Sequence, residues 1–202
     1  MTNFSYLALG DSYTIGEKVA FDDNFPNKTV KLLTELGYPF YLPKIIAKTG
    51  FTTEELIKAI EQSNTIEFYD IVSLLIGVNN QYRGYSLAEF KIEFEQLLQR
   101  AIYFADNKPK RVFVLSIPDW GVTPFAEGRN RNQVAVEIDA YNFICASSAN
   151  EYKTNFINIT DMQRVDGARA EFLAADGLHP SAEEYEKWAV KLSYKILNEL
   201  KV

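Results

Sequence analysis

Two short stretches near opposite ends of the chain carry side chains suited to nucleophilic catalysis. Gly10 and Asp11 precede Ser12 directly after a short apolar run, and Asp176 precedes the single histidine, His179, by three residues. A serine hydroxyl becomes nucleophilic when a neighbouring base accepts its proton, and histidine is the usual base near neutral pH. An aspartate hydrogen-bonded to Nδ1 would fix the tautomer of that histidine. The pattern predicts Ser12 as nucleophile, His179 as base and Asp176 as the group that orients it.

Both stretches also suit structural roles without chemistry. Turns of Gly, Asp and Ser after strands are common, because glycine tolerates backbone angles that a side chain forbids. Asp176 and Gly177 could form an ordinary turn before a helix that opens at Pro180 and Ser181. The two interpretations of this second stretch have similar weight on the local sequence alone, so other motifs must decide between them.

Candidate oxyanion donors lie in two further fragments that follow predicted strands. Gly50 comes after the second strand, and Gly77-Val78-Asn79-Asn80 directly follows the third. The backbone amides of Ser12 and Gly50 and the side-chain amide of Asn79 could converge on one oxyanion, where preoriented donors stabilise developing charge. Taken singly, Gly50 also suits a plain turn and Asn79 a plain loop. Together the four fragments fall at one edge of one sheet, which unrelated turns would seldom do.

The elements that must position these residues alternate between strand-like and helix-like runs. Nearly continuous apolar runs, such as 71–76 and 112–117, are typical of parallel strands that helices cover on both faces. Pro43 and the short fifth run suit sheet edges, which favours the flavodoxin-like order 2-1-3-4-5. We therefore predict an α/β fold with parallel strands at Tyr6–Leu9, Tyr41–Ile46, Ile71–Ile76, Val112–Ile117 and Phe156–Ile159.

Three helix starts are marked by predicted capping boxes, in which a hydroxyl caps the N3 amide and a glutamate reaches back to the cap amide. The capping residues are Thr52, Ser86 and Ser181, so we expect helices near 53–61, 87–104 and 182–200. The residue pattern predicts two more helices, near 27–36 and 131–150.

In four fragments the chain resembles the SGNH hydrolases, also called GDSL-type esterases and lipases: Gly10-Asp11-Ser12, Gly50, Gly77-Val78-Asn79-Asn80 and Asp176-Gly177-Leu178-His179. These blocks occur in the family's order and span essentially the whole chain. The resemblance implies a flavodoxin-like three-layer α/β/α domain that hydrolyses esters without a metal or cofactor. It assigns Ser12, His179 and Asp176 to a catalytic triad, and the amides of Ser12 and Gly50 with the Asn79 side chain to an oxyanion hole.

Two positions depart from the usual pattern of that family. Its third block commonly reads Gly-x-Asn-Asp, whereas Asn80 replaces the aspartate here and removes a charge expected beside Asn79. Tyr13 follows the nucleophile at a position where leucine is frequent. This larger side chain is expected to reshape the mouth of the pocket.

Residues beside the nucleophile and in one irregular segment are candidates for substrate binding. Asp11 and Tyr13 flank Ser12, and Trp120 and Phe125 lie in Pro118–Asn130, a segment rich in glycine, proline and aromatic residues. Long irregular segments are often functional loops, so the two aromatic residues are expected to line an acyl or alcohol pocket. An equally good interpretation is that they only pack the loop.

Composition limits the class of protein. The 202 residues suffice for one substantial core, so a single domain over 1–202 is predicted. A net charge of −6 argues against nucleic-acid binding, and no apolar run is long enough for a membrane span. The single cysteine, Cys145, cannot form an internal disulfide, and one cysteine with one histidine cannot build the usual zinc site. Residues 1–5 lack a signal-like segment, so a cytoplasmic location is expected.

These observations favour a serine carboxylester hydrolase that acts on a small ester through an acyl-enzyme. The resemblance permits a short-chain acyl ester, an O-acetylated sugar, a lysophospholipid or a thioester, with no cofactor or metal. The alternative is a non-hydrolytic module that binds a small ligand such as a flavin at the same sheet edge. Visible absorbance would favour the flavin, whereas a covalent fluorophosphonate adduct at Ser12 would favour the hydrolase. The sequence predicts no particular oligomeric state.

Overall fold

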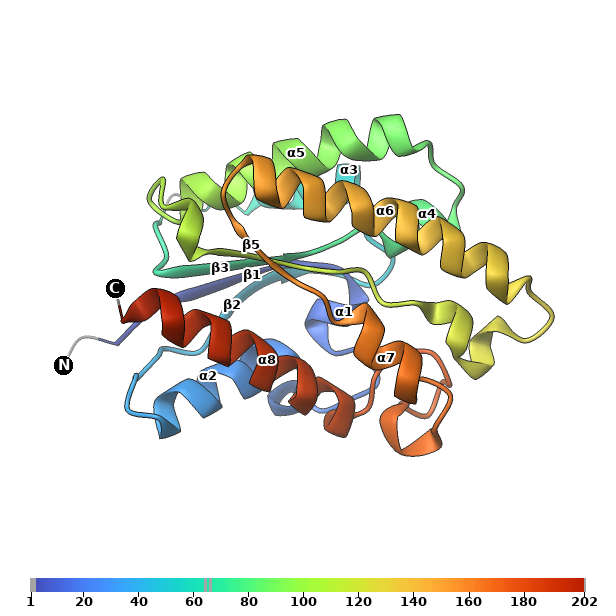
Figure 1. Ribbon diagram of the computed structural model, residues 1–202. Helices are drawn as coiled ribbons and strands as arrows, with labels where there is room; N and C mark the ends of the chain where they lie inside the picture. The colour runs from blue at the N-terminus through green and yellow to red at the C-terminus, as the bar shows by residue number, and fades with distance from the viewer. Residues whose placement is uncertain (1–2, 64, 66, 202) are drawn as a thin grey trace.

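A five-stranded parallel sheet forms the centre of the computed structural model, which describes residues 3–63, 65 and 67–201 (Figure 1). Its order is β2-β1-β3-β4-β5, and each neighbouring pair is parallel. The predicted α/β fold and strand order are therefore confirmed. The strands are β1 (Tyr6–Gly10), β2 (Lys44–Ala47), β3 (Ile71–Leu75), β4 (Val112–Leu115) and β5 (Asn155–Ile157).

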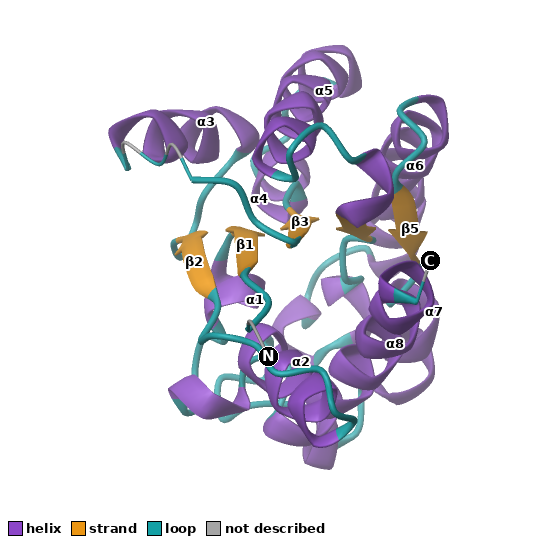
Figure 2. Ribbon diagram, turned by 90° about the vertical axis from the view of Figure 1, so that its left-hand side faces the viewer, coloured by secondary structure: helices purple, strands orange, loops and turns teal. Residues whose placement is uncertain are grey.

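Helices cover both faces of the sheet and give three layers. Helices α3, α4, α5 and α6 lie on one face, and α1, α2, α7 and α8 lie on the other (Figure 2). The strands β1, β3 and β4 are buried throughout, whereas β2 and β5 are partly exposed at the edges. The helices are α1 (Ser12–Ile15), α2 (Phe25–Glu35), α3 (Thr53–Gln62), α4 (Val78–Tyr82), α5 (Leu87–Phe104), α6 (Arg131–Glu151), α7 (Thr160–Asp166) and α8 (Ala182–Leu200).

The second strand begins three residues later than predicted, at Lys44 instead of Tyr41. Tyr41 and Leu42 are exposed, and Pro43 has no backbone N–H to donate to the ladder. Pairing with β1 therefore starts only after the proline, with Lys44 opposite Leu7.

Strands β4 and β5 end two residues earlier than predicted, at Leu115 and Ile157. The Ser116 hydroxyl accepts hydrogen bonds from the backbone amides of Ile159 and Thr160, at 2.8 and 3.0 Å. These side-chain contacts take the place of backbone hydrogen bonds that would extend the pairing of β4 with β5. Helix α7 begins at Thr160.

All five predicted helices are present, with ends within two residues of the prediction. Only Thr52 forms a reciprocal capping box with its glutamate. Ser86 and Ser181 cap their helices, but the boxes predicted there are wrong. The Glu89 carboxylate instead accepts from the Ser86 hydroxyl at 2.9 Å, and Glu184 accepts from Trp188 Nε1 at 2.8 Å.

The segment Pro118–Asn130 is more ordered than predicted, because it contains two short 3-10 helices, Trp120–Val122 and Pro124–Ala126. The buried Asp119 carboxylate accepts from the Gly121 amide at 2.9 Å and pairs with Arg164 at 2.8 Å. These contacts fix the segment at the carboxyl end of β4.

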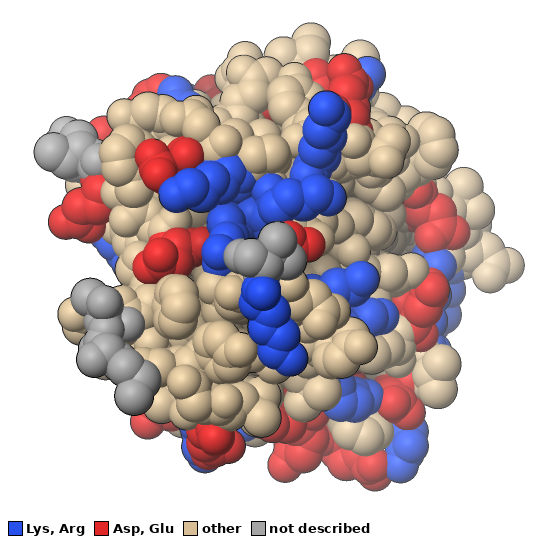
Figure 3. Space-filling model, turned by 60° about the vertical axis from the view of Figure 1, so that its left-hand side comes forward, with Lys and Arg blue, Asp and Glu red and all other residues tan. Residues whose placement is uncertain are grey.

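Charged side chains are unevenly distributed over the surface. Figure 3 brings forward the left-hand side of Figure 1, and Lys and Arg side chains gather on the face it shows. Lys108, Lys110 and Arg111 belong to this end of the molecule, because they precede β4 at its amino end. Ser12 follows the carboxyl end of β1, so these cations lie away from it. Within the described chain, no helix combines the length and hydropathy needed to cross a bilayer.

Substitution of Gly10 by alanine is expected to destabilise the fold by about 3 kcal/mol or more, because the new Cβ overpacks the exit of β1. That Cβ would lie 2.5 Å from the Leu75 carbonyl oxygen and closer still to Thr14 Oγ1. Urea unfolding measures the effect. As a control, Gly37→Ala meets no atom within 4 Å and costs only about 1–2 kcal/mol for its positive φ. Equal costs at the two positions would contradict the packing argument.

Candidate active site

Ser12 lies where β1 meets the short helix α1, at the carboxyl edge of the sheet. Asp11 is the N-cap residue of that helix, and its carboxylate accepts a hydrogen bond from the Tyr13 amide at 3.0 Å. As the first residue of α1, Ser12 has a backbone N–H without an acceptor inside the helix. Its side chain is buried except where a cavity opens onto it.

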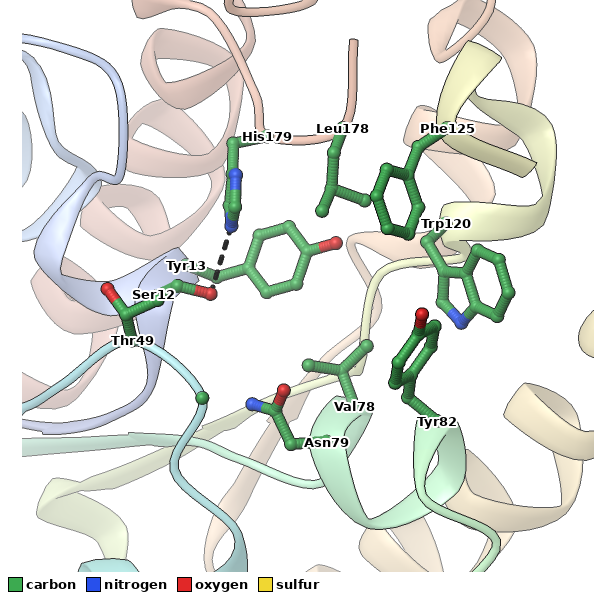
Figure 4. Close-up of a pocket in the computed structure, with 11 residues that line it drawn as sticks. Ser12, Tyr13, Thr49, Val78, Asn79, Tyr82, Trp120, Phe125, Leu178 and His179 are labelled. Carbon is green, nitrogen blue, oxygen red and sulfur yellow. Dashed lines mark hydrogen bonds between the residues drawn. The ribbon is translucent and has the colours of Figure 1, made fainter. Parts of the chain in front are cut away.

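The turn before α8 brings Asp176 and His179 to the same place. One carboxylate oxygen of Asp176 accepts hydrogen bonds from the amides of Leu178 and His179, both at 3.0 Å. The other oxygen lies 2.7 Å from His179 Nδ1, and His179 Nε2 lies 3.0 Å from Ser12 Oγ (Figure 4). The three residues predicted as a triad therefore form one continuous chain of contacts, although 167 positions separate Ser12 from His179.

The environment of Asp176 keeps its carboxylate ionised. Burial acts to raise the pKa of Asp176, but hydrogen bonds from the His179 ring and from the amides of His179 and Leu178 outweigh it. The pKa therefore lies below its ordinary value. An ionised carboxylate accepts the Nδ1–H bond, which leaves Nε2 as the lone-pair nitrogen that faces Ser12.

Asn79 and Gly50 approach Ser12 from two other loops at the same sheet edge. Both line the cavity that contains Ser12. The Asn79 side-chain amide donates to the Phe51 carbonyl at 2.9 Å, which leaves its second N–H free. The Gly50 amide has no acceptor in the described structure, and glycine adopts its φ of 84° without strain. The residues predicted as oxyanion donors are thus gathered around one cavity.

Arg83 holds the Gly50 turn in place, a role that the sequence did not indicate. Its Nη2 donates to the Gly50 carbonyl at 2.7 Å, and its Nη1 lies 3.2 Å from a Glu55 carboxylate oxygen. Because Arg83 follows α4, which carries Asn79, it ties the two loops together.

A mainly apolar cavity of about 190 Å³ opens beside Ser12 and His179 (Figure 4). Tyr13, Trp120 and Phe125, which the sequence suggested as substrate-binding residues, are among the residues that line it. Asp11 does not line it, because its carboxyl group is turned into the cap of α1.

Sequence reasoning missed four residues of the cavity wall: Thr49, Val78, Tyr82 and Leu178. Two of them had a usable signal. Leu178 lies between the predicted orienting group and the base, and Tyr82 lies four residues after Val78, one turn along the same helix face. Among the described residues, no group of three or more His, Cys, Asp or Glu side chains could hold a metal ion.

Comparison with known proteins identifies the family. The model of the GDSL-like Lipase/Acylhydrolase family matches residues 8–187. The chain belongs to this family. Membership makes the protein a GDSL-type esterase or lipase, a carboxylester hydrolase, and decides between the two functions expected from the sequence. No curated protein sequence matches this GDSL hydrolase.

Solved structures share the fold of this GDSL hydrolase at low sequence identity. The lipase/acylhydrolase from Enterococcus faecalis aligns with a TM-score of 0.75 and 20% identity, over 96% of each chain. TesA aligns with a TM-score of 0.73 and 19% identity, over 98% of each chain. A variant of Axe2, an acetyl xylan esterase from Geobacillus stearothermophilus, aligns at 0.68 and 19% identity, over 96% of this chain and 95% of that one.

The asparagine that replaces the usual aspartate in this GDSL hydrolase has a specific structural role. Asn80 Oδ1 accepts from the Thr53 amide at 3.1 Å, and Asn80 Nδ2 donates to Thr53 Oγ1 at 2.7 Å. The Thr53 hydroxyl in turn donates to the Glu93 carboxylate. A carboxylate at position 80 could not make the Nδ2 donation and would compete with Glu93 for the hydroxyl proton, so the neutral amide suits this site.

Asp11 is more deeply buried than Asp176, and its carboxylate accepts a hydrogen bond from the Tyr13 amide. Burial raises the pKa of Asp11 to about 7, although the Tyr13 amide acts in the opposite direction. The folded protein therefore holds a proton on Asp11 at a pH where the unfolded chain has released it.

The free energy of unfolding is expected to include a component that falls as pH rises from about 4 to about 7. In this window the folded state binds more protons at Asp11 than the unfolded state does. Asp11→Asn keeps an oxygen acceptor for the Tyr13 amide and removes the titration. In urea unfolding, the free energy of unfolding of Asp11→Asn relative to wild type should rise by on the order of a few kcal/mol between pH 5 and pH 7.5. Asp22→Asn, at an exposed position, is the control variant, and equal pH profiles for wild type and Asp11→Asn would refute the assignment.

Proposed function

We propose that Ser12 is the nucleophile, His179 the general base and Asp176 the residue that orients it, in hydrolysis of a small ester through an acyl-enzyme. The observation that carries this proposal is the contact chain from Ser12 Oγ to His179 Nε2, at 3.0 Å, and from His179 Nδ1 to Asp176, at 2.7 Å. Both distances lie within the hydrogen-bond reach that proton transfer requires.

The first half of the reaction forms the acyl-enzyme. Ser12 Oγ attacks the ester carbonyl while His179 Nε2 takes the hydroxyl proton, and ionised Asp176 stabilises the resulting imidazolium. Negative charge develops on the former carbonyl oxygen. The amides of Ser12 and Gly50 and the second N–H of Asn79 supply the donors for it. His179 then gives its proton to the leaving alcohol as the carbon–oxygen bond breaks.

The second half releases the acid. His179 takes a proton from a water molecule, and the resulting nucleophile attacks the acyl carbonyl held by the same three donors. Collapse of that intermediate returns the proton to Ser12 Oγ and frees the carboxylic acid.

The size and chemistry of the cavity support a short acyl group as the substrate class. An engineered apolar cavity of about 150 Å³ in another protein holds one benzene molecule, so about 190 Å³ suits an acyl group of roughly six carbon atoms or fewer. The apolar side chains of Val78, Trp120 and Leu178 favour a carbon chain over a charged group. We propose a short-chain acyl ester in preference to a lysophospholipid.

Ser12→Ala is expected to lower kcat/KM for p-nitrophenyl acetate by on the order of 10⁴-fold or more, because triad members act together. Wild type should also form a one-to-one fluorophosphonate adduct, detected by intact-protein mass, that the variant does not form. Ser147→Ala, an exposed serine on α6, is the matched control and should keep both properties. Near-normal turnover by Ser12→Ala would overturn the proposal.

Asn79→Ala is expected to lower kcat by roughly 10²–10³-fold with little change in KM, because an oxyanion donor acts mainly in the transition state. Steady-state kinetics on p-nitrophenyl acetate separate the two constants, and thermal unfolding checks that the variant is folded. A raised KM at unchanged kcat would show that Asn79 serves ground-state binding instead.

A further inference from the structure

A second hollow lies next to the catalytic cavity and shares two lining residues with it. It has a volume of about 340 Å³, and amide, guanidinium and carboxylate groups belong to its walls. Tyr82 and Trp120 line both this hollow and the catalytic cavity. Figure 4 shows these two aromatic side chains at the end of the cavity opposite Ser12. An acyl chain that extends from Ser12 along the cavity therefore meets these rings first.

Trp120 forms the more rigid part of this boundary. It is 4% exposed, whereas Tyr82 is 48% exposed and has solvent on one side. The Trp120 ring lies edge-to-face with the Tyr82 ring at 5.4 Å and with the Phe125 ring at 5.9 Å. Because protein interiors are close-packed, a buried indole held in this way cannot turn aside without displacing its neighbours.

A chain of hydrogen bonds fixes the orientation of the indole. Trp120 Nε1 donates to Gln81 Oε1 at 2.7 Å, and Gln81 Nε2 donates to Glu137 Oε2, also at 2.7 Å. Gln133 Nε2 donates to the other Glu137 oxygen at 2.8 Å. An indole N–H only donates and a carboxylate only accepts, so the Gln81 amide, which does both, fits between them. Gln81 lies on α4 with Asn79, so one helix supports both the candidate oxyanion donor and the far wall of the cavity.

We propose that Trp120 sets the maximum length of the acyl group, because its indole separates the catalytic cavity from the second hollow. The inference rests on the proposed function, since it needs an acyl group bound in the cavity beside Ser12. With the indole in place, the acyl group has about 190 Å³, and the second hollow would add about 340 Å³. A smaller side chain at position 120 joins the two volumes and removes the steric barrier to longer chains. Trp120 is thereby a specificity residue and takes no part in bond breaking.

The acyl-length preference for p-nitrophenyl esters tests the proposal. The measured quantity is kcat/KM for the octanoate divided by kcat/KM for the butanoate. This ratio is expected to be about 10-fold or more higher in Trp120→Ala than in wild type, because the variant buries methylenes that the closed cavity excludes. Trp120→Leu, a milder truncation, should raise the ratio in the same direction and serves if the alanine variant does not fold. Thermal unfolding shows whether each variant is folded.

Two further variants test the part played by the second hollow. Val134→Ala is the matched control, because the buried Val134 side chain lines the hollow but is not among the residues that line the catalytic cavity. It enlarges the hollow without opening the boundary, so the octanoate-over-butanoate ratio should equal that of wild type. In the double variant Trp120→Ala/Gln133→Trp, an indole at an exposed position refills the hollow, and the ratio should return toward the wild-type value.

The outcomes separate this inference from the proposed function. If wild type hydrolyses p-nitrophenyl acetate in a Ser12-dependent manner but the ratio is unchanged in both Trp120 variants, only the inference is wrong. An equal rise in Val134→Ala also overturns it, because general loosening of the core would then explain the effect. A ratio that stays high in the double variant contradicts the use of the second hollow. If no ester is hydrolysed in a Ser12-dependent manner, the proposed function fails first, and the inference fails with it.

Discussion

The contact between Ser12 and His179 depends on α8 lying against the same face of the sheet as α1. Buried aromatic side chains fix that position. The Tyr13 ring lies 5.3 Å from the His179 ring and 6.2 Å from that of Trp188, and Trp188 in turn packs against Phe25 of α2 at 6.2 Å. Because protein interiors are close-packed, the placement of each ring restricts the next. The distance between Ser12 and His179 is therefore set by the hydrophobic core, and the local turns only aim the two side chains.

Most of the fold could be predicted because its signals are local. Continuous apolar runs located the central strands, and the hydroxyls of Ser86 and Ser181 located two helix starts to the residue. Properties that depend on distant residues could not be predicted. The Ser116 hydroxyl ends β4 by accepting amides 43 and 44 positions further along the chain, and Glu184 bonds to an indole instead of its own cap. No pattern within a short window contains these partners.

Ser12, Gly50 and Asn79 were predictable as site residues because they follow the ends of β1, β2 and β3, where loops converge, whereas Asp176 and His179, in the turn before α8, were predicted from their residue types and spacing. Their environments were not. Asp11 and Asp176 are the same residue type, in two motifs that meet only in the folded chain. Burial raises the pKa of Asp11 to about 7, whereas hydrogen bonds lower the pKa of Asp176. The support that Arg83 gives to Gly50 spans 33 positions and no motif marks it. Residue type and spacing predicted the chemistry, whereas the protonation of the two aspartates and the contact that holds the Gly50 turn depend on three-dimensional packing.

The aromatic wall of the cavity and the turn that carries His179 share one backbone hydrogen bond, from the Phe125 amide to the Gly177 carbonyl at 3.1 Å. A bound molecule too large for the cavity would push Phe125 outward, and this bond would pull the imidazole away from Ser12. A molecule that fits poorly is then bound less tightly, and it also leaves His179 misaligned with Ser12. Small misalignments at a reacting centre slow chemistry steeply. In the proposed mechanism, discrimination between acyl groups therefore acts on the turnover rate as well as on the affinity.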